Sequence, residues 1–213
     1  MARIRAADYA DKRNALLMVA ARLFARDGFD RTSIADIAEA AEVSKALLYH
    51  YYASKDALLF AIIHGHLLDL VSQVEAADDA SLPPGDHLLI LIETVLFAYR
   101  DADAMHKVQI NELDRLTEDQ QRIIRELERR LVAIVARAFA RLNPDLDGAG
   151  EALLKPVAMS LFGALNWSYL WFRDDGPMSR ATYALMVARL FVDGAARLTP
   201  AAVGATPYPS RFA

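Results

Sequence analysis

The 213-residue sequence predicts an all-α protein. Nearly every segment repeats its apolar residues with a period of 3.6, and no stretch alternates with a period of two. Serine and threonine caps and glycine or proline breaks separate these segments. Hydrophobic residues make up 54% of the chain and charged residues 24%, which favours a sizeable core and excludes a disordered chain. We expect about nine helices. The length allows either one large domain or one small domain with a medium-sized one.

Apolar stripes and caps locate the helices. Residues 16–24 form one stripe, and Gly28 is placed to end that helix as a C′ glycine. Thr32 or Ser33 is the expected N-cap of the next helix, and Ser44 of the one after it. The remaining helices are expected over residues 34–41, 45–51, 54–77, 86–99, 103–113, 117–142, 151–172 and 179–198. One face of helix 117–142 is expected to be apolar through Ile123, Leu127, Leu131, Ile134, Val135, Ala138 and Leu142.

The cysteine content and the lengths of the apolar runs exclude several classes of protein. The absence of cysteine removes disulfides, thiolate catalysis and Cys-ligated zinc. We expect no signal peptide and no membrane span, because the uninterrupted apolar runs are shorter than about 18 residues. A cytoplasmic protein is therefore expected.

The net charge of −4 is unevenly distributed. Residues 1–60 carry 9 Lys/Arg against 8 Asp/Glu, whereas residues 61–213 carry 15 against 20. If this chain meets phosphate, the N-terminal quarter is where we expect it.

Residues 32–55 predict a helix-turn-helix, because two short capped helices are joined by a turn of about three residues. In the second helix, Leu48 and Tyr52 are four residues apart and are expected to face inward. Helical periodicity then turns the opposite side outward, namely Lys45, Ala46, Tyr49 and His50. Such a face suits a DNA groove, although a solvated helix with two exposed aromatic residues is the alternative.

The expected DNA contacts divide by chemistry. Lys45 can reach a guanine edge or a phosphate, and Ala46 and Leu47 can contact a thymine methyl group. Tyr49 and His50 can donate to phosphates or touch base edges. Helix N-termini supply further backbone anchors, and Arg3 and Arg5 can form an arm for the minor groove. The candidate DNA-binding residues are Thr32, Ser33, Ser44, Lys45, Ala46, Leu47, Tyr49, His50 and Lys55.

Five N-terminal segments together match the pattern of a known family: residues 20–24, 28–29, 32–38, 43–52 and 54–58. They resemble the DNA-binding domain of the tetracycline-repressor (TetR) family of bacterial regulators. The resemblance implies a homodimeric, all-helical repressor with a three-helix DNA-binding domain over residues 1–56 and a ligand-binding and dimerisation domain over 57–198. The family often has glycine in the turn where this chain has Glu42, so a positive φ there would strain the backbone by about 1 kcal/mol. Prolines and small residues predict a flexible tail over 199–213.

Other segments resemble one branch of that family. Residues 162–167 and 171–177 are similar to regulators that respond to acyl-CoA thioesters in fatty-acid, sterol or aromatic-acid catabolism. Residues 3–9 and 47–52 are similar to regulators of phenylacetate degradation within that branch. The resemblance implies an acyl-CoA effector, such as an aryl-acetyl-CoA or a fatty acyl-CoA.

The remaining candidates lie in the C-terminal domain. Arg115, Arg122 and Arg125 can meet CoA phosphates, or they form part of a solvated helix face. Candidate ligand-lining residues are Leu70, Phe97, Met105, Gln109, Asn111, Asn166, Trp167 and Trp171. The last two helices are apolar on most sides, so we expect a homodimer interface through Leu161, Phe162, Leu165, Tyr169, Tyr183, Met186, Leu190 and Phe191.

We expect neither an enzyme nor a metal or cofactor. The sequence has no glycine-rich phosphate loop, no GxSxG elbow and no HExxH motif. His64 and His66 diverge on a helix, and His66 shares a face with Asp69 but with no third ligand. An architectural DNA-binding protein without a ligand and an all-helical enzyme remain as alternatives. DNA, a second copy of the chain and a small-molecule effector are the expected partners, without a membrane.

Overall fold

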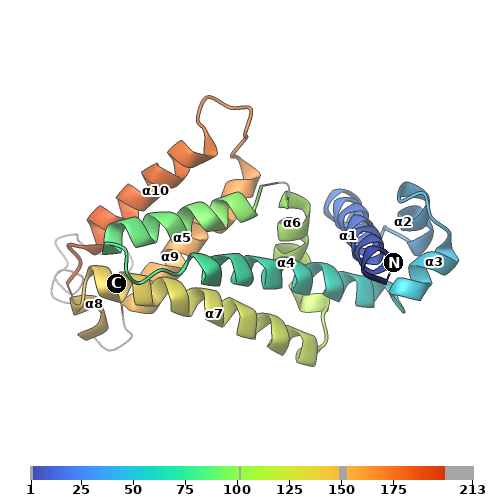
Figure 1. The fold of residues 1–213 in the computed structure, drawn as a ribbon, viewed down its shortest axis with the longest axis horizontal. Helices are drawn as coiled ribbons and strands as arrows, with labels where there is room; N and C mark the ends of the chain where they lie inside the picture. The colour runs from blue at the N-terminus through green and yellow to red at the C-terminus, as the bar shows by residue number, and fades with distance from the viewer. Residues whose placement is uncertain (1, 101, 149–152, 200–213) are drawn as a thin grey trace, which may run out of the picture. The chain divides into compact units, whose positions relative to one another are not determined.

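The computed structural model describes residues 2–100, 102–148 and 153–199, and within α1 it describes side chains from Lys12 onward. These residues form α-helices and short 3₁₀ helices without a strand, which confirms the predicted all-α class (Figure 1). The predicted tail 199–213 lies outside the described residues except for Thr199. In chain order the helices are α1 (Ala2–Asp27), α2 (Ile34–Ala40), α3 (Lys45–Tyr51), α4 (Lys55–Ala77), α5 (Pro84–Ala98), α6 (Asp103–Glu112), η1 (Leu113–Arg115), α7 (Glu118–Leu142), α8 (Asp145–Gly148), α9 (Leu154–Asn166), η2 (Trp167–Leu170) and α10 (Arg180–Ala195).

The described helices exceed the predicted nine, the last two predicted ranges are shortened, and one residue of a predicted apolar face is exposed. The helix expected over 151–172 is shorter, because α9 ends at Asn166 and the chain tightens into η2. Helix α10 ends at Ala195 rather than at residue 198. In the first turns of α7, Ile124 is buried, whereas the predicted Ile123 is exposed. Both are spaced acceptably from Leu127, so periodicity alone could not choose between them.

The chain divides into two compact units. The first comprises residues 1–69 and 99–127, and the second residues 70–98 and 128–213. The boundaries between them fall within α4, at the end of α5 and within α7. The first unit therefore contains α6 and η1 as well as the predicted helix-turn-helix.

The first unit is built around α1. Helix α1 packs against α2 and α6, and α2 packs against α3. Leu16, Phe24, Ile37 and Leu48 are buried in its core, and Ala20 is fully buried, which lets the helices approach closely. As predicted, Gly28 ends α1: its φ is +89° and its N–H donates to the Phe24 carbonyl at 3.0 Å.

In the second unit, α5, α9 and α10 pack on one another. Asn143 holds the end of α10 by donating from Nδ2 to the Ala195 and Leu198 carbonyls, both at 2.8 Å. Arg180, at the start of α10, donates to the Leu96 carbonyl at 2.8 Å and to Asp174. These buried donors fix the connections at the two ends of α10.

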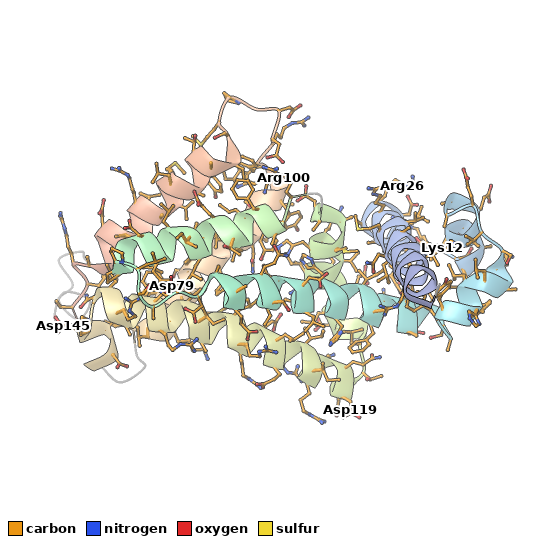
Figure 2. All side chains as sticks on the ribbon, viewed as in Figure 1. Lys12, Arg26, Asp79, Arg100, Asp119 and Asp145 are labelled. Atoms are coloured by element: carbon orange, nitrogen blue, oxygen red, sulfur yellow. The ribbon has the colours of Figure 1, made fainter. Side chains whose placement is uncertain are left out.

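Apart from Arg180, charged side chains lie mostly on the outside of the described helices, as Lys12, Arg26 and Asp119 illustrate (Figure 2). Helix α4 is more apolar than a typical surface helix. By length and hydropathy alone it could cross a membrane, although it contains no long uninterrupted apolar run. Half of that apolar stretch is buried inside the protein, including Leu58, Ile62 and Val71. The pattern is that of the core helix of a helical protein.

Candidate nucleic-acid interface

Helix α3 turns two chemically different faces in opposite directions. Leu48 is fully buried and Tyr52 is 5% exposed, as predicted from their spacing. Lys45, Ala46, Leu47, Tyr49 and His50 are all exposed. A short helix fixed by Leu48 therefore presents a cation, a phenol and an imidazole beside a small alanine on one accessible side.

Both short helices begin at serine caps. Ser33 Oγ accepts from the Asp36 N–H at 3.2 Å, and the Asp36 carboxylate accepts from the Ser33 N–H at 2.7 Å, which forms a capping box. The Ser33 backbone and then its hydroxyl lower the pKa of Asp36. Ser44 Oγ accepts from the Leu47 N–H at 3.1 Å and caps α3. The caps set where each helix begins, and thus where Lys45 is placed.

The turn between α2 and α3 has the left-handed residue that the sequence suggested. Glu42 has a φ of +54°, the only positive value among the described non-glycine residues. The Val43 N–H donates to the Ala38 carbonyl at 2.9 Å, and the Glu42 N–H donates to the Glu39 carbonyl at 3.0 Å. These two bonds form a Schellman motif, which ends α2 and directs the chain into α3.

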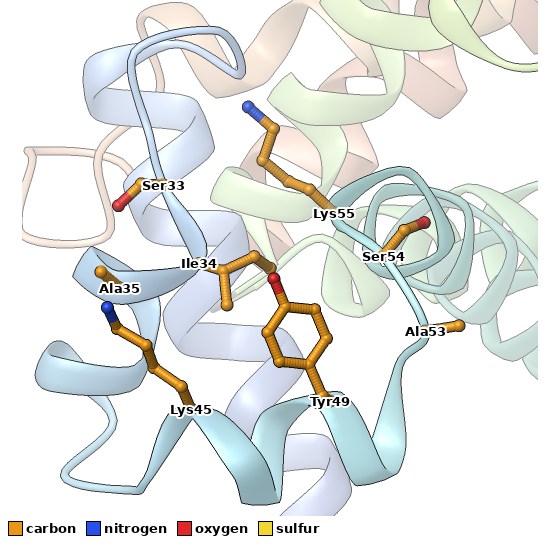
Figure 3. A pocket seen from close by; sticks show the side chains of 8 residues that line it. All are labelled: Ser33, Ile34, Ala35, Lys45, Tyr49, Ala53, Ser54 and Lys55. Carbon is orange, nitrogen blue, oxygen red and sulfur yellow. The ribbon is translucent and has the colours of Figure 1, made fainter.

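A shallow groove of about 530 Å³ lies between the start of α2 and the exposed face of α3. Figure 3 shows Lys45 and Tyr49 rising from α3 on the side where α2 begins. Lys45 and Tyr49 provide side-chain donors, and no acidic side chain lines the groove. Its lining residues are Ser33, Ile34, Ala35, Lys45, Tyr49, Ala53, Ser54 and Lys55. This chemistry suits a polyanion with apolar edges, which describes a DNA groove.

Two of the predicted DNA-binding side chains have hydrogen-bond partners within the chain. Thr32 is buried, and its hydroxyl donates to the Gly28 carbonyl at 2.9 Å. The Lys55 ammonium donates to the Phe29 and Thr32 carbonyls at 2.9 and 3.1 Å. Both side chains hold the loop before α2, because its carbonyls need donors where no helix supplies them. For the other predicted DNA-binding residues, contact with DNA remains a prediction; Arg3 and Arg5 lie in α1, and their side chains fall outside the described set.

The predicted ligand-lining residues differ in exposure, and a ligand site formed by them remains a prediction. Leu70 is buried and Gln109 is largely enclosed, whereas Phe97, Asn111, Trp167 and Trp171 are exposed. Met105 and Asn166 are half-buried.

A buried polar cluster in the first unit was missed as a group. The His106 ring lies 4.2 Å from the Tyr99 ring and 5.7 Å from the His66 ring, centroid to centroid. All three side chains are buried, and His66 Nε2 has no hydrogen-bond partner in the described part of the chain. Burial, and secondarily His106, lowers the pKa of His66 to about 4, and burial raises that of Tyr99. Polar residues at apolar positions of α4, α5 and α6 were the available signal.

The three arginines considered for CoA phosphates have partners within the chain. Arg115 pairs with Asp30 and Glu112, Arg122 with Asp119 at 2.7 Å, and Arg125 donates to the Gln121 amide oxygen at 3.1 Å. Within the described residues, no group of three metal-ligating side chains comes together.

The predicted dimer interface separates into two groups. Leu161, Phe162, Leu165 and Tyr183 are buried in the core of the second unit, so the interface assignment is wrong for these side chains. Met186 and Leu190 are exposed, and Tyr169 and Phe191 are half-buried. An apolar helix face can pack either in the chain's own core or against a partner, and the sequence alone does not distinguish these two cases. Further exposed apolar side chains on the same elements are Met159, Trp167, Leu170, Trp171 and Leu185.

The capped helix pair and its outward face define a helix-turn-helix DNA-binding protein. The family model described as bacterial regulatory proteins, tetR family, matches residues 16–62, and the model of the tetracyclin repressor-like C-terminal domain matches residues 81–195. The chain belongs to the TetR family of bacterial regulators, as its sequence had indicated.

Three known proteins are similar to this chain over different lengths. A TetR-family regulator structure from Bordetella parapertussis 12822 is 35% identical, with a TM-score of 0.79, covering 85% of this chain and 94% of that one. AibR in complex with isovaleryl coenzyme A and operator DNA is 25% identical, with a TM-score of 0.72, covering 84% and 97%. The transcriptional repressor KstR2 of Rhodococcus jostii (strain RHA1) is 35% identical over 95 residues, which span 45% of each chain.

Proposed function

We propose that this protein is a cytoplasmic, homodimeric transcriptional repressor that binds a palindromic operator and is released by a small-molecule effector. The observation that carries the proposal is the outward face of α3, held by buried Leu48 and bordered by the groove. In this proposal residues 1–56 form the DNA-binding domain and residues 57–198 the effector and dimerisation domain. No enzymatic activity is assigned, in keeping with a family of regulators.

Within the operator, α3 enters the major groove with Lys45 foremost. Lys45 donates to a guanine edge or a phosphate, and Ala46 and Leu47 contact thymine methyl groups. Tyr49 and His50 donate to the phosphate backbone at the groove rim. The serine-capped start of α2 faces the same groove and adds backbone donors.

The homodimer is proposed to form through the exposed apolar side chains of the second unit. Met186 and Leu190 lie on α10, and Met159 lies on α9. A two-fold contact of this kind pairs the same surface of each copy. It would set the two recognition helices about 34–36 Å apart, which matches successive major grooves.

The proposed effector is an acyl-CoA thioester. Support comes from the similarity of 84% of this chain to AibR, whose structure holds isovaleryl coenzyme A and operator DNA. The ring nitrogen Nε2 of buried His66 has no hydrogen-bond partner among the described residues. In this proposal it forms a hydrogen bond with a polar group of the effector. Effector binding is proposed to favour an arrangement with altered recognition-helix spacing; a typical coupling changes operator affinity about 5- to 150-fold.

The test has two stages. Selection of duplexes from a random-sequence library by the purified full chain should yield a palindrome with half-sites about one helical turn apart. Thermal-shift measurements with isovaleryl-CoA, phenylacetyl-CoA, palmitoyl-CoA and the matching free acids then identify the effector class, since a ligand at 100 times its Kd adds about 2.7 kcal/mol. Failure to enrich any sequence would reject operator recognition, and stabilisation by the free acids alone would reject the CoA thioester.

A further inference from the structure

The loop between α1 and α2 is held by a side chain from far along the chain. Arg115, in η1 directly after α6, pairs with Asp30 through both terminal guanidinium nitrogens, one at 2.9 Å. The same guanidinium lies 5.2 Å from the centroid of the Phe29 ring. Its Nε donates to Glu112, which orients the guanidinium from its own helix. The three contacts fix a planar group in one position.

The same loop is held on another side by Lys55. Its ammonium donates to the Phe29 and Thr32 carbonyls and lies 4.2 Å from the Phe29 ring centroid. Buried Phe29 is therefore approached by one cation from η1 and one from the start of α4. Ser33 directly follows Thr32, caps α2 and lines the groove beside Lys45.

We propose that Arg115 is a positioning residue for DNA recognition, which acts through Asp30 and Phe29 to fix the loop that places the start of α2. This inference rests on the proposed function. Helix α6 packs along α1 within the same unit. A displacement of α6 would move η1, and Arg115 would then release or shift the residues that form one wall of the groove.

Energetics favours a positioning role over a stabilising one. Asp30 is 70% exposed and the Arg115 side chain 41% exposed, and exposed ion pairs add little to the global stability of a fold. The geometry is nevertheless specific, because two parallel donors and a ring contact restrict the guanidinium more than charge alone would. Loss of Arg115 should therefore alter the loop before it alters the fold.

The experiment compares Arg115→Gln, Asp30→Asn and the double variant in the full-length protein. The matched control is Arg122→Gln, since Arg122 pairs with Asp119 on α7 and does not touch the loop. The probe is the duplex selected by the unsubstituted protein. We expect about fivefold or greater loss of operator affinity in each single variant, and the double variant no weaker than the singles. The control should retain the original affinity.

Two further measurements separate positioning from other roles. Amide hydrogen exchange at residues 32–36 should accelerate in Arg115→Gln without DNA, with α10 unchanged. The salt dependence of binding should keep its slope, whereas loss of a direct phosphate contact would reduce the slope by about one. Unchanged affinity and exchange, a reduced slope, or additive single effects would overturn the inference. Failure of the original protein to select any duplex would instead reject the proposed function.

Discussion

Leu48 and Tyr49 are neighbours on α3 and point in opposite directions: Leu48 is fully buried and Tyr49 is 53% exposed. One side chain holds the helix in the core of the first unit, and the next is exposed and can reach a ligand. The contrast predicts opposite outcomes for two adjacent substitutions. Tyr49→Ala should weaken operator binding without loss of stability, because an exposed side chain contributes little to the fold.

The companion variant is Leu48→Ala. It should lower the free energy of unfolding by about 2–5 kcal/mol, since truncation leaves a cavity in the core of the first unit. Urea unfolding and operator titration on both proteins measure the two effects. A stability loss in Tyr49→Ala comparable to that of Leu48→Ala would contradict the face assignment.

Lys45 is predicted to contact DNA through its charge. Lys45→Gln should weaken binding to the selected duplex and reduce the slope of log affinity against log salt by about one, because one fewer counterion is released. Lys12→Gln is the matched control, since Lys12 is also exposed but lies on α1 outside the groove. Equal slopes for all three proteins would show that Lys45 meets no phosphate.

Glu42 carries backbone strain that a single change should relieve. Glu42→Gly should raise the free energy of unfolding by up to about 1 kcal/mol, because glycine tolerates the φ of +54° although its unfolded chain has more freedom. Glu39→Gly, within α2, should instead lower stability by about 1 kcal/mol through poorer helix propensity. Thermal denaturation compares them, and destabilisation by both changes would argue against strain at the turn.

His66 should make stability depend on pH. Its folded pKa of about 4 lies below the ordinary 6.5, so the unfolded state binds more protons between these values. The stability contribution is complete above pH 6.5 and is lost as the pH falls toward 4, by about 3 kcal/mol at most.

His66→Phe removes that titration while keeping a ring in the core. The difference in unfolding free energy between His66→Phe and the original protein should grow as the pH falls from 6.5 to 4, in favour of the variant. His64→Phe, on the same helix but only half-buried, is the control. Parallel pH profiles for the original protein and His66→Phe would refute the buried neutral imidazole.

The exposed apolar surface of α10 is predicted to hold the dimer. Leu190 is 66% exposed, and Leu190→Asp should shift the sedimentation mass from dimer to monomer because a charge in an apolar interface loses its hydration. Arg189→Asp alters charge at the neighbouring exposed position and serves as the control. A dimer that survives Leu190→Asp would place the interface elsewhere.

The sequence by itself determined the helix-turn-helix and its register. Ser33 and Ser44 cap the two helices, Gly28 ends the one before them, and the four-residue spacing of Leu48 and Tyr52 orients α3. These features depend on contacts within a few residues, so local backbone chemistry is sufficient to predict them.

Only the tertiary structure decided the roles of Lys55, Arg115, His66 and the apolar residues of α9 and α10. Each role depends on a partner far along the chain: Lys55 meets a carbonyl 26 residues away, and Arg115 meets a carboxylate 85 residues away. Helical periodicity indicates that Leu161 and Leu190 both lie on apolar faces, but not which face the chain itself covers. That choice follows from packing, which depends on how distant helices meet rather than on the spacing within any one of them.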